Sequence, residues 1–223
     1  MHASLRQKFP YTALITILAV VYFCAGKFGL SLAFFHPSAS PVWPSSGIAL
    51  AVLLLWGQRL WPGIFLGAFL VNATTQGTFA TSLGIATGNT LEALLGAWLV
   101  QRFAQGSEVF KQAKDIFKFV LLAAMLSTAL GATVGVTSVS LGGFAPWEHY
   151  RTIWLTWWLG DMVGDVIVTP LFVIWLTQAP PPFAAKRISE AVGLLAIMVA
   201  IHGLIFLDSL PSGLEYLALP PLL

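Results

Sequence analysis

The sequence predicts an all-α fold, a bundle of helices that crosses a membrane several times. Hydrophobic residues make up 57% of its 223 residues and charged residues only 9%, and the mean hydropathy is +0.84. A soluble domain carries about a quarter charged residues, so this chain has too few polar groups to cover its own surface in water. Long apolar segments recur along the whole chain, which is typical of a polytopic transmembrane helical bundle.

About eight hydrophobic segments follow one another along the chain. They cover residues 11–35, 45–57, 61–73, 82–101, 117–140, 153–177 and 188–207, and a last one begins near residue 215. A helix needs about 20 residues to span a bilayer. The second and third segments are therefore short, and we expect them to be tilted, half-inserted or re-entrant. The eighth stops before it could cross, so we expect residues 1–223 to form a single integral membrane domain, cut within its last helix and without an output domain.

The basic residues predict the orientation of these segments. Arg151 falls in a loop on one side of the membrane, whereas alternating spans place nine basic residues on the other side. The nine are Arg6, Lys8, Arg59, Arg102, Lys111, Lys114, Lys118, Lys186 and Arg187. Because basic residues favour the cytoplasmic side of a membrane, the amino terminus is predicted to be cytoplasmic.

The loops on the outer side are predicted from the same alternation. They would cover residues 36–44, 73–81, 141–152 and 208–213. Tryptophan side chains favour the boundary between lipid and water. We therefore expect Trp43, Trp147 and Trp154 to lie near membrane interfaces.

Four ionisable residues fall inside predicted spans, namely Lys27, Glu92, Asp161 and Asp165. Helical rise, counted from the outer end of each segment, places all four roughly 12–18 Å below the outer surface. A charged side chain at the centre of a span costs ~2.5–3.5 kcal/mol on insertion scales, and such residues mark functional sites by default. Three different helices therefore offer charge at a similar depth.

Residue spacing within these segments predicts inward faces. One stripe of the sixth segment recurs at i, i+4, i+7 and i+11 and contains Trp154, Trp158, Asp161 and Asp165. Asn89 and Glu92 are three residues apart and share a face in the same way. Three small-xxx-small pairs, which allow helix backbones to approach closely in lipid, are Gly63 with Gly67, Gly84 with Gly88, and Gly160 with Gly164. Pro170 removes a backbone hydrogen bond and is a candidate for a kink.

Two interpretations of this layer of charge stay open. In the first, the residues form an internal ion-pair network that fixes helix register, with Lys27 neutralising one carboxylate. The second starts from the surplus of three acids over one base, which requires either a protonated carboxyl or a bound cation or cationic ligand. The layer would then be a ligand-binding, ion-binding or proton-responsive site. Its candidate residues are Lys27, Asn89, Glu92, Trp158, Asp161 and Asp165.

The sequence predicts neither catalysis nor a bound metal or cofactor. His36, His149 and His202 have no ligand-like spacing to one another or to the single cysteine. A Gly-rich phosphate loop, a nucleophile elbow and a zinc-binding helix motif are all absent from the sequence. We therefore expect a module that is not an enzyme.

The motifs resemble those of a known family. Several segments, in order, are similar to the bacterial membrane-associated sensor domain of the first type (the MASE family). They are 41–50, 57–63, 66–69 with Asn72, 88–93, and 154–161 with Pro170. The resemblance covers about residues 28–220. The positions that we assign to structural motifs are Trp43, Pro44, Trp61, Pro62, Gly63, Gly67, Asn72, Gly160, Gly164 and Pro170. Lys27 and Asp165 follow from the burial argument and not from the family pattern.

This resemblance implies a sensory module of about eight helices in a bacterial inner membrane. In that family the module usually precedes a cytoplasmic histidine kinase, diguanylate cyclase or phosphodiesterase. The leading hypothesis is therefore a signal-input domain that relays a stimulus to such an output domain, fused or associated, as part of a two-component or cyclic-di-GMP system. A homodimer is compatible with this role, and nucleic acid is not an expected partner.

Two other functions stay open at this point. A small-solute or ion transporter or channel would also use intramembrane carboxylates. A passive membrane anchor would tolerate neutralisation of Asp161 and Glu92 without any change in output.

Overall fold

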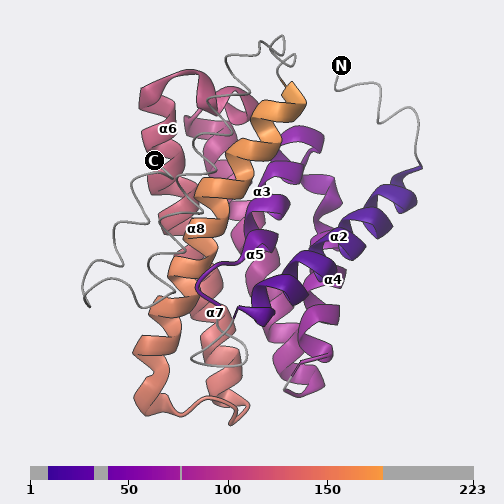
Figure 1. Cartoon of the computed structure of the whole chain (residues 1–223), viewed down its shortest axis with the longest axis vertical. Helices are drawn as coiled ribbons and strands as arrows, with labels where there is room; N and C mark the ends of the chain where they lie inside the picture. The colour runs from indigo at the N-terminus through magenta and orange to yellow at the C-terminus, as the bar shows by residue number, and fades with distance from the viewer. Residues whose placement is uncertain (1–9, 33–39, 76, 178–223) are drawn as a thin grey trace, which may run out of the picture. The chain divides into compact units, whose positions relative to one another are not determined.

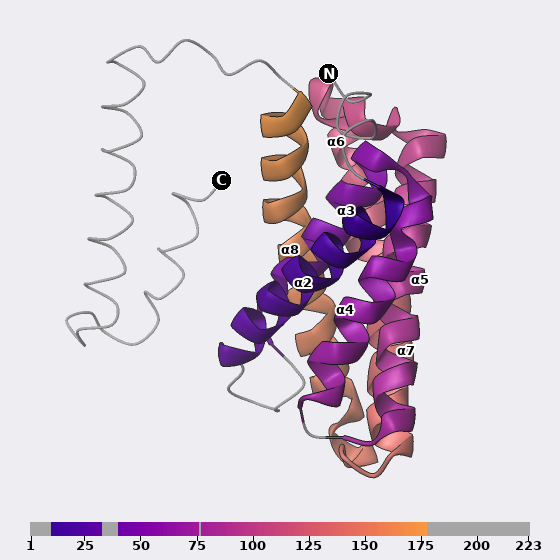
Figure 2. The same ribbon diagram turned by 90° about the vertical axis from the view of Figure 1, so that its right-hand side faces the viewer.

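The computed structural model describes residues 10–32, 40–75 and 77–177. The chain divides into two compact units, Met1–Ala179 and Pro180–Leu223, and all described residues lie in the first. Within these ranges every regular element is a helix (Figures 1 and 2). The elements are α2 (Tyr11–Ser31), α3 (Pro44–Trp56), η1 (Gln58–Leu60), α4 (Trp61–Ala73), α5 (Phe79–Phe103), η2 (Gly106–Lys111), α6 (Ala113–Phe119), η3 (Val120–Ser127), α7 (Thr128–Leu141), η4 (Trp147–His149) and α8 (Tyr150–Thr177).

The first six predicted segments each correspond to helix in the structure. Among the described residues, four helical stretches are long and apolar enough to cross a membrane: Tyr11–Ser31, Phe79–Phe103, Ala113–Leu141 and Trp147–Thr177. Helices α3 and α4 have only 13 residues each. That length rises about 20 Å, less than the ~30 Å hydrocarbon core. The predicted segments at 188–207 and beyond 215 lie outside the described residues, so the count of eight is not confirmed.

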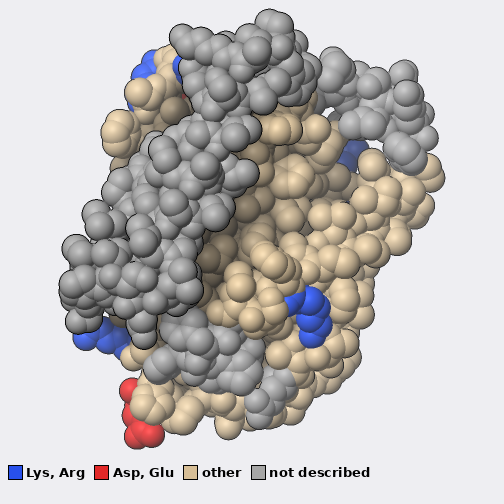
Figure 3. All heavy atoms as spheres, in the orientation of Figure 1, with Lys and Arg blue, Asp and Glu red and all other residues tan. Residues whose placement is uncertain are grey.

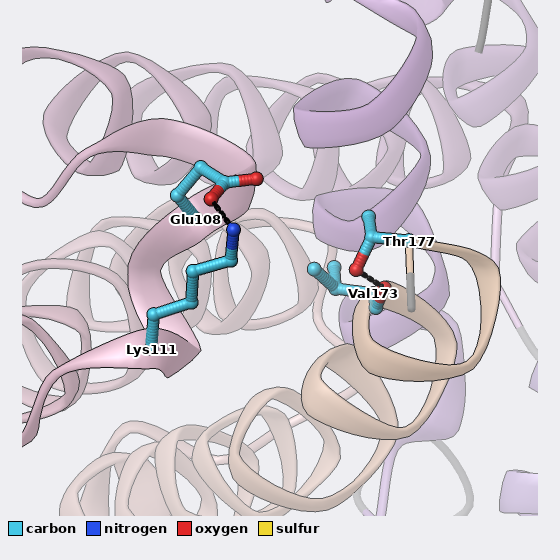
Figure 4. Close-up of polar contacts among 4 residues, drawn as sticks. All are labelled: Glu108, Lys111, Val173 and Thr177. Carbon is cyan, nitrogen blue, oxygen red and sulfur yellow. Dashed lines mark hydrogen bonds and ion pairs between the residues drawn. The ribbon is translucent and has the colours of Figure 1, made fainter. Parts of the chain in front are cut away.

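Contacts between glycines and neighbouring helices show how the elements run. Trp43, just before α3, contacts Gly160 of α8, and Gly47, four residues later, contacts Gly164, also four residues later. Because both contacts advance in the same direction, α3 and α8 are parallel. The last turn of α8 also lies beside η2. Figure 4 shows this neighbourhood, with the ion pair between Glu108 and Lys111 near the hydrogen bond from the Thr177 hydroxyl to the Val173 carbonyl. The α3–α4 turn, η2 and the end of α8 therefore share one end of the bundle.

Most of the described basic residues gather at that end, which we call the basic end. It includes Arg59, Arg102, Lys111, Lys114 and Lys118, whereas Arg151 lies at the start of α8, at the opposite end. The sides of the bundle carry large exposed apolar residues such as Phe28, Leu121 and Ile167. In Figure 3 the described surface is mostly free of charge, with acidic and basic groups at a few places. This distribution fits a protein whose sides face lipid.

Helix α3 lies in the middle of the described bundle and is its most buried helix. Ten of its residues are buried, from Ser45 to Ala51 and from Leu53 to Leu55. It packs against α8, α5 and α2. The run from Ile48 to Leu55 is apolar on every side of the helix. Such a helix is typically buried among other helices or in lipid.

Glycine pairs sit where helices approach most closely. A Cβ atom at Gly67 would lie 2.7 Å from the Tyr22 Cβ, and one at Gly63 would lie 2.8 Å from the Ile15 carbonyl oxygen, so this pair packs on α2. Gly84 and Gly88 pack in the same way on α7. Small residues at helix interfaces allow the close van der Waals contact that holds helices together in lipid.

The segment before α3 corrects two predictions. The Trp43 side chain is only 7% exposed, and its backbone N–H donates to the Gly160 carbonyl at 3.0 Å. Gly160 lies ten residues beyond the start of α8 at Tyr150, roughly 15 Å along the helix. Trp43 is therefore inside the bundle and not at an interface, and Ser40–Trp43 is not part of an exposed outer loop. The reason is packing, because Gly160 leaves room for this backbone.

The repeated Trp-Pro pair has a simple conformational role. Pro44 and Pro62 both stand in the first turn of a helix, where a missing N–H costs nothing. The two tryptophans nevertheless differ, because Trp61 is 45% exposed while Trp43 is buried. Further along, η3 is a π-helix from Val120 to Ser127, which the sequence pattern did not predict.

Candidate functional site

The first turn of α3 packs directly on α8 where the two aspartates lie. A Cβ atom at Gly164 would lie 2.1 Å from the Trp43 carbonyl oxygen, and one at Gly160 would lie 2.2 Å from the Ser40 carbonyl oxygen. No side chain larger than hydrogen fits at either position. The predicted small-xxx-small pair, Gly160 and Gly164, therefore packs against the segment Ser40–Trp43 and the start of α3, and not against the side of another helix.

Asp161 and Asp165 are buried at this junction, 1% and 2% exposed. The Ser46 hydroxyl donates to the Asp161 backbone carbonyl at 3.0 Å and also lies within interaction range of the Asp165 carboxylate. The beginning of a helix carries partial positive charge and unpaired N–H groups, which favour nearby anions. The start of α3 therefore offers the two carboxylates some electrostatic compensation.

Helix α5 brings a third carboxylate and an amide to the same region. Glu92 is 3% exposed, and its Oε2 lies beside Gly131 of α7. A Cβ atom added at Gly131 would lie only 1.8 Å from this oxygen. One turn earlier, the Asn89 Nδ2 donates to the Tyr22 hydroxyl at 3.0 Å. The Tyr22 hydroxyl in turn lies close to the Trp43 indole.

These side chains form one group, drawn from α2, α3, α5 and α8. Glu92 interacts electrostatically with both Asp161 and Asp165, and Tyr22 with Glu92 and Asp161. We call this group the polar cluster and define it as Tyr22, Ser46, Asn89, Glu92, Asp161 and Asp165. The structure thus brings together four of the six predicted sensing candidates.

The polar cluster lacks hydrogen-bond donors. Four oxygens of the cluster are buried and have no hydrogen-bond partner among the described residues: Asn89 Oδ1, Glu92 Oε2, Asp161 Oδ2 and Asp165 Oδ1. The ion pairs among the described residues are Lys111–Glu108, Lys118–Asp115 and His149–Glu148, and none involves the cluster. Burial of a polar group without a hydrogen-bond partner lowers protein stability by about 1–3 kcal/mol, as judged from mutational data. A bound donor or cation would recover that free energy.

A small cavity adjoins the cluster. It has a volume of about 10 Å³ and is lined by Ser40, Trp43, Asn72 and Trp157. The Trp43 Nε1 is buried near the Tyr22 hydroxyl but forms no well-aligned hydrogen bond with any described residue. Such a space holds about one water molecule, which the indole N–H could hydrogen-bond. Anything larger requires the helices to move.

Lys27 lies away from the carboxylates. Its Nζ donates to the carbonyls of Val71 at 3.3 Å and Thr74 at 2.9 Å and to the Thr75 Oγ1 at 3.1 Å. These acceptors stand at the end of α4, which carries partial negative charge. The interpretation in which Lys27 neutralises a buried carboxylate is therefore wrong in this structure, because closer acceptors satisfy the ammonium group.

Replacement of Lys27 by methionine is expected to destabilise the protein by about 1–2 kcal/mol, since three hydrogen bonds to a charged donor are lost. The apparent melting temperature in detergent, followed by circular dichroism, should fall by roughly 2–8 °C. Lys114→Met, at an exposed position, is the control. An equal change in both variants would show that the cap on α4 contributes nothing.

The remaining candidates lie around the cluster. Trp154 and Trp158 stack with ring centroids 5.5 Å apart. The Trp158 Nε1 donates to the Met125 carbonyl at 2.9 Å, inside the π-helix. Helix α8 continues through Pro170 to Thr177. Trp61, Pro62, Gly63 and Gly67 lie on α4, where the two glycines pack against α2, outside the cluster.

Sequence reasoning missed Tyr22, Ser46, Gly131 and Trp157. Tyr22 has the weakest signal, a single hydroxyl in an apolar segment. Ser46 lies two residues after Pro44 of the Trp-Pro pair. Gly131 begins a small-xxx-small pair with Gly135, against which the Trp157 ring packs. These spacings were visible but did not indicate which helices would meet.

Comparisons with known proteins agree with the motifs. The MASE1 family model matches residues 14–223, which is nearly the whole chain. No curated protein and no solved structure shows a significant match. Among the described residues, no group of three or more His, Cys, Asp or Glu side chains is arranged to hold a metal ion.

Proposed function

The chain belongs to the MASE1 family of membrane-associated sensor domains, and we propose that the polar cluster is its sensing element. In this proposal residues 1–223 act as one input domain in a bacterial inner membrane, with a cytoplasmic amino terminus. The domain relays its state to a cytoplasmic histidine kinase or a cyclic-di-GMP enzyme, fused or associated.

The observation that supports this proposal is the set of four buried oxygens without donors. All four are acceptors, so a stimulus that reaches them has to supply hydrogen bonds or positive charge. A ligand shifts a conformational equilibrium only through its different affinity for the two states. A packing in which these acceptors are satisfied would be favoured when the ligand is bound, and the unsatisfied packing would be populated without it.

Helix α3 is positioned to carry the change. It starts beside Asp161 and Asp165 and runs parallel to α8 toward the basic end. At Gly47, Gly160 and Gly164 the backbones of the two elements approach each other directly. A shift of the aspartates would therefore move the start of α3 directly, and the α3–α4 turn would move with it.

The proposal is tested by neutralising two carboxyls together, Glu92→Gln with Asp161→Asn. In the complete signalling protein, or with the chain fused to a reporter kinase, the output's response to its stimulus should fall roughly 5- to 150-fold, the usual range of coupling between two sites. The charge that couples α5 to α8 is then absent. Output activity is read in membranes, with the amount of inserted protein measured by immunoblot.

Thr87→Ala is the control for this variant. Thr87 is exposed on α5, and its hydroxyl donates only to the Leu83 carbonyl of the same helix. A double variant that responds like wild type would support the passive-anchor hypothesis and rule out the polar cluster as the sensing element.

Transport is the second candidate, and one observation favours it. Helix α3 starts inside the bundle beside buried carboxylates, and transporters often place discontinuous helices and ionisable groups near the middle of the membrane. Liposomes that contain the purified chain decide between the two functions. Saturable, gradient-driven flux would establish transport, whereas a sensor gives none.

A further inference from the structure

A groove of about 560 Å³ lies at the basic end, far from the polar cluster along α3. Its lining comes from the start of α2 and from the α3–α4 turn: Tyr11, Leu14, Trp56, Gly57, Gln58, Arg59 and Leu60. The Tyr11 hydroxyl donates to the Arg59 carbonyl, which joins the two walls. The Gly57–Gly63 motif, which the sensing element does not use, supplies most of this lining.

Exposed aromatic residues next to the groove indicate that it lies near the boundary between lipid and water. Tyr11 and Trp61, at the starts of α2 and α4, are 49% and 45% exposed. Aromatic side chains of this kind collect at the boundary between hydrocarbon and water. The basic residues Arg102, Lys111 and Lys114 stand at the same end of the bundle.

The chemistry of the lining is that of an anion site with an apolar extension. The exposed Arg59 forms no ion pair with any described residue. A guanidinium binds phosphate through two parallel hydrogen bonds, and Gln58 adds an amide. From the groove, Leu14, Ile17 and Val21 form one stripe of α2, and Ile17 and Val21 are 51% and 41% exposed. This stripe leads toward the hydrocarbon region.

We propose that this groove binds an anionic phospholipid, with the phosphate at Arg59 and one acyl chain along the α2 stripe. A soluble phosphate would use the guanidinium but not the apolar stripe. Anionic lipids are abundant at the cytoplasmic face of membranes, where basic sites between helices bind their headgroups. The lipid would hold the start of α2 against the α3–α4 turn.

The test uses the purified chain in detergent with phosphatidylglycerol or phosphatidylcholine at equal mole fraction. Bound lipid is counted by native mass spectrometry, and the melting temperature is recorded. Phosphatidylglycerol should be retained and should raise the melting temperature, while phosphatidylcholine should do neither. Arg59→Gln should weaken the retention about tenfold or more, the effect of losing a charge-assisted pair. Arg59→Lys should keep part of it, and Arg151→Gln, at the opposite end, should keep all of it.

Three outcomes would overturn the proposal. Equal retention of both lipids would show that charge is not recognised. Displacement of the lipid by inorganic phosphate at similar concentration would show a phosphate site without a lipid component. Retention that appears only after deletion of residues 2–9 would show that the chain's own amino-terminal segment occupies the groove. Because none of these measurements involves signalling, they leave the proposed sensing element untouched.

Discussion

Replacement of Gly47 by valine is expected to be among the most destabilising single changes in the described bundle. A Cβ atom there would lie 2.2 Å from the Gly164 carbonyl oxygen and 2.7 Å from the Val168 Cβ. The obstacle is backbone in the middle of α8, which cannot turn aside. Overpacking of this kind costs about 3 kcal/mol at the upper end of its usual range. The apparent melting temperature should therefore fall by roughly 6–12 °C.

A second glycine provides the matched comparison. A Cβ at Gly96 would meet the Ser127 Oγ at 2.8 Å, and this hydroxyl can turn aside by giving up its hydrogen bond to the Ala123 carbonyl, at a cost of about 1 kcal/mol. Alanine at this position also gains up to about 1 kcal/mol of helix propensity. Gly96→Ala should thus melt close to wild type in the same detergent. If Gly47→Val melted there too, α3 and α8 would not be in backbone contact.

Glu92→Lys is expected to fix the domain in one signalling state. The introduced ammonium would lie among two aspartates and the Asn89 amide oxygen, and would supply the donors and the charge that the polar cluster lacks. A group that satisfies the acceptors permanently acts as a ligand that never dissociates. The output should become constant at its liganded level, and its dependence on the stimulus should fall roughly 5- to 150-fold.

This variant is measured beside Glu92→Gln in the complete signalling protein. Glutamine removes one charge but leaves the aspartates without a cation, so its output should lie on the unliganded side. The two variants are therefore expected to shift the output in opposite directions, and not only by different amounts. Identical output from both would mean that the charge of the cluster does not set the signalling state. Melting temperatures of both variants establish that each is folded.

The location of the cluster explains why its chemistry is costly to maintain. Among the described residues, the buried carboxyl groups of the cluster have no cationic partner. The compensation that the structure offers is the nearby start of α3 and the Ser46 hydroxyl beside the Asp165 carboxyl group. A purely structural network would be expected to pair its charges, as Lys118 and Asp115 do at 3.0 Å. The difference favours a functional reason for the cluster.

Helix positions were largely predictable, and partners were not. The six segments that fall within the described residues were located from hydropathy alone, because the bilayer requires long apolar runs. The same reasoning put Trp43 at an interface and left open a pairing of Lys27 with the acids, since the depth of a residue along a helix does not say which way its side chain points. Tyr22 was missed because one hydroxyl gives no periodic signal.

The sequence by itself determined that the chain is a helical membrane protein, which family it belongs to, and that Asn89, Glu92, Asp161 and Asp165 are unusual for their surroundings. Composition and short motifs are enough for this, because each depends on residues that are close in sequence. The tertiary structure alone decided that α3 starts inside the bundle, that Glu92 lies within electrostatic range of the aspartates of another helix, and that Lys27 is held by the end of α4. Those outcomes depend on which backbones approach most closely. Glycines at 47, 160 and 164 settle that through contacts between residues more than a hundred positions apart.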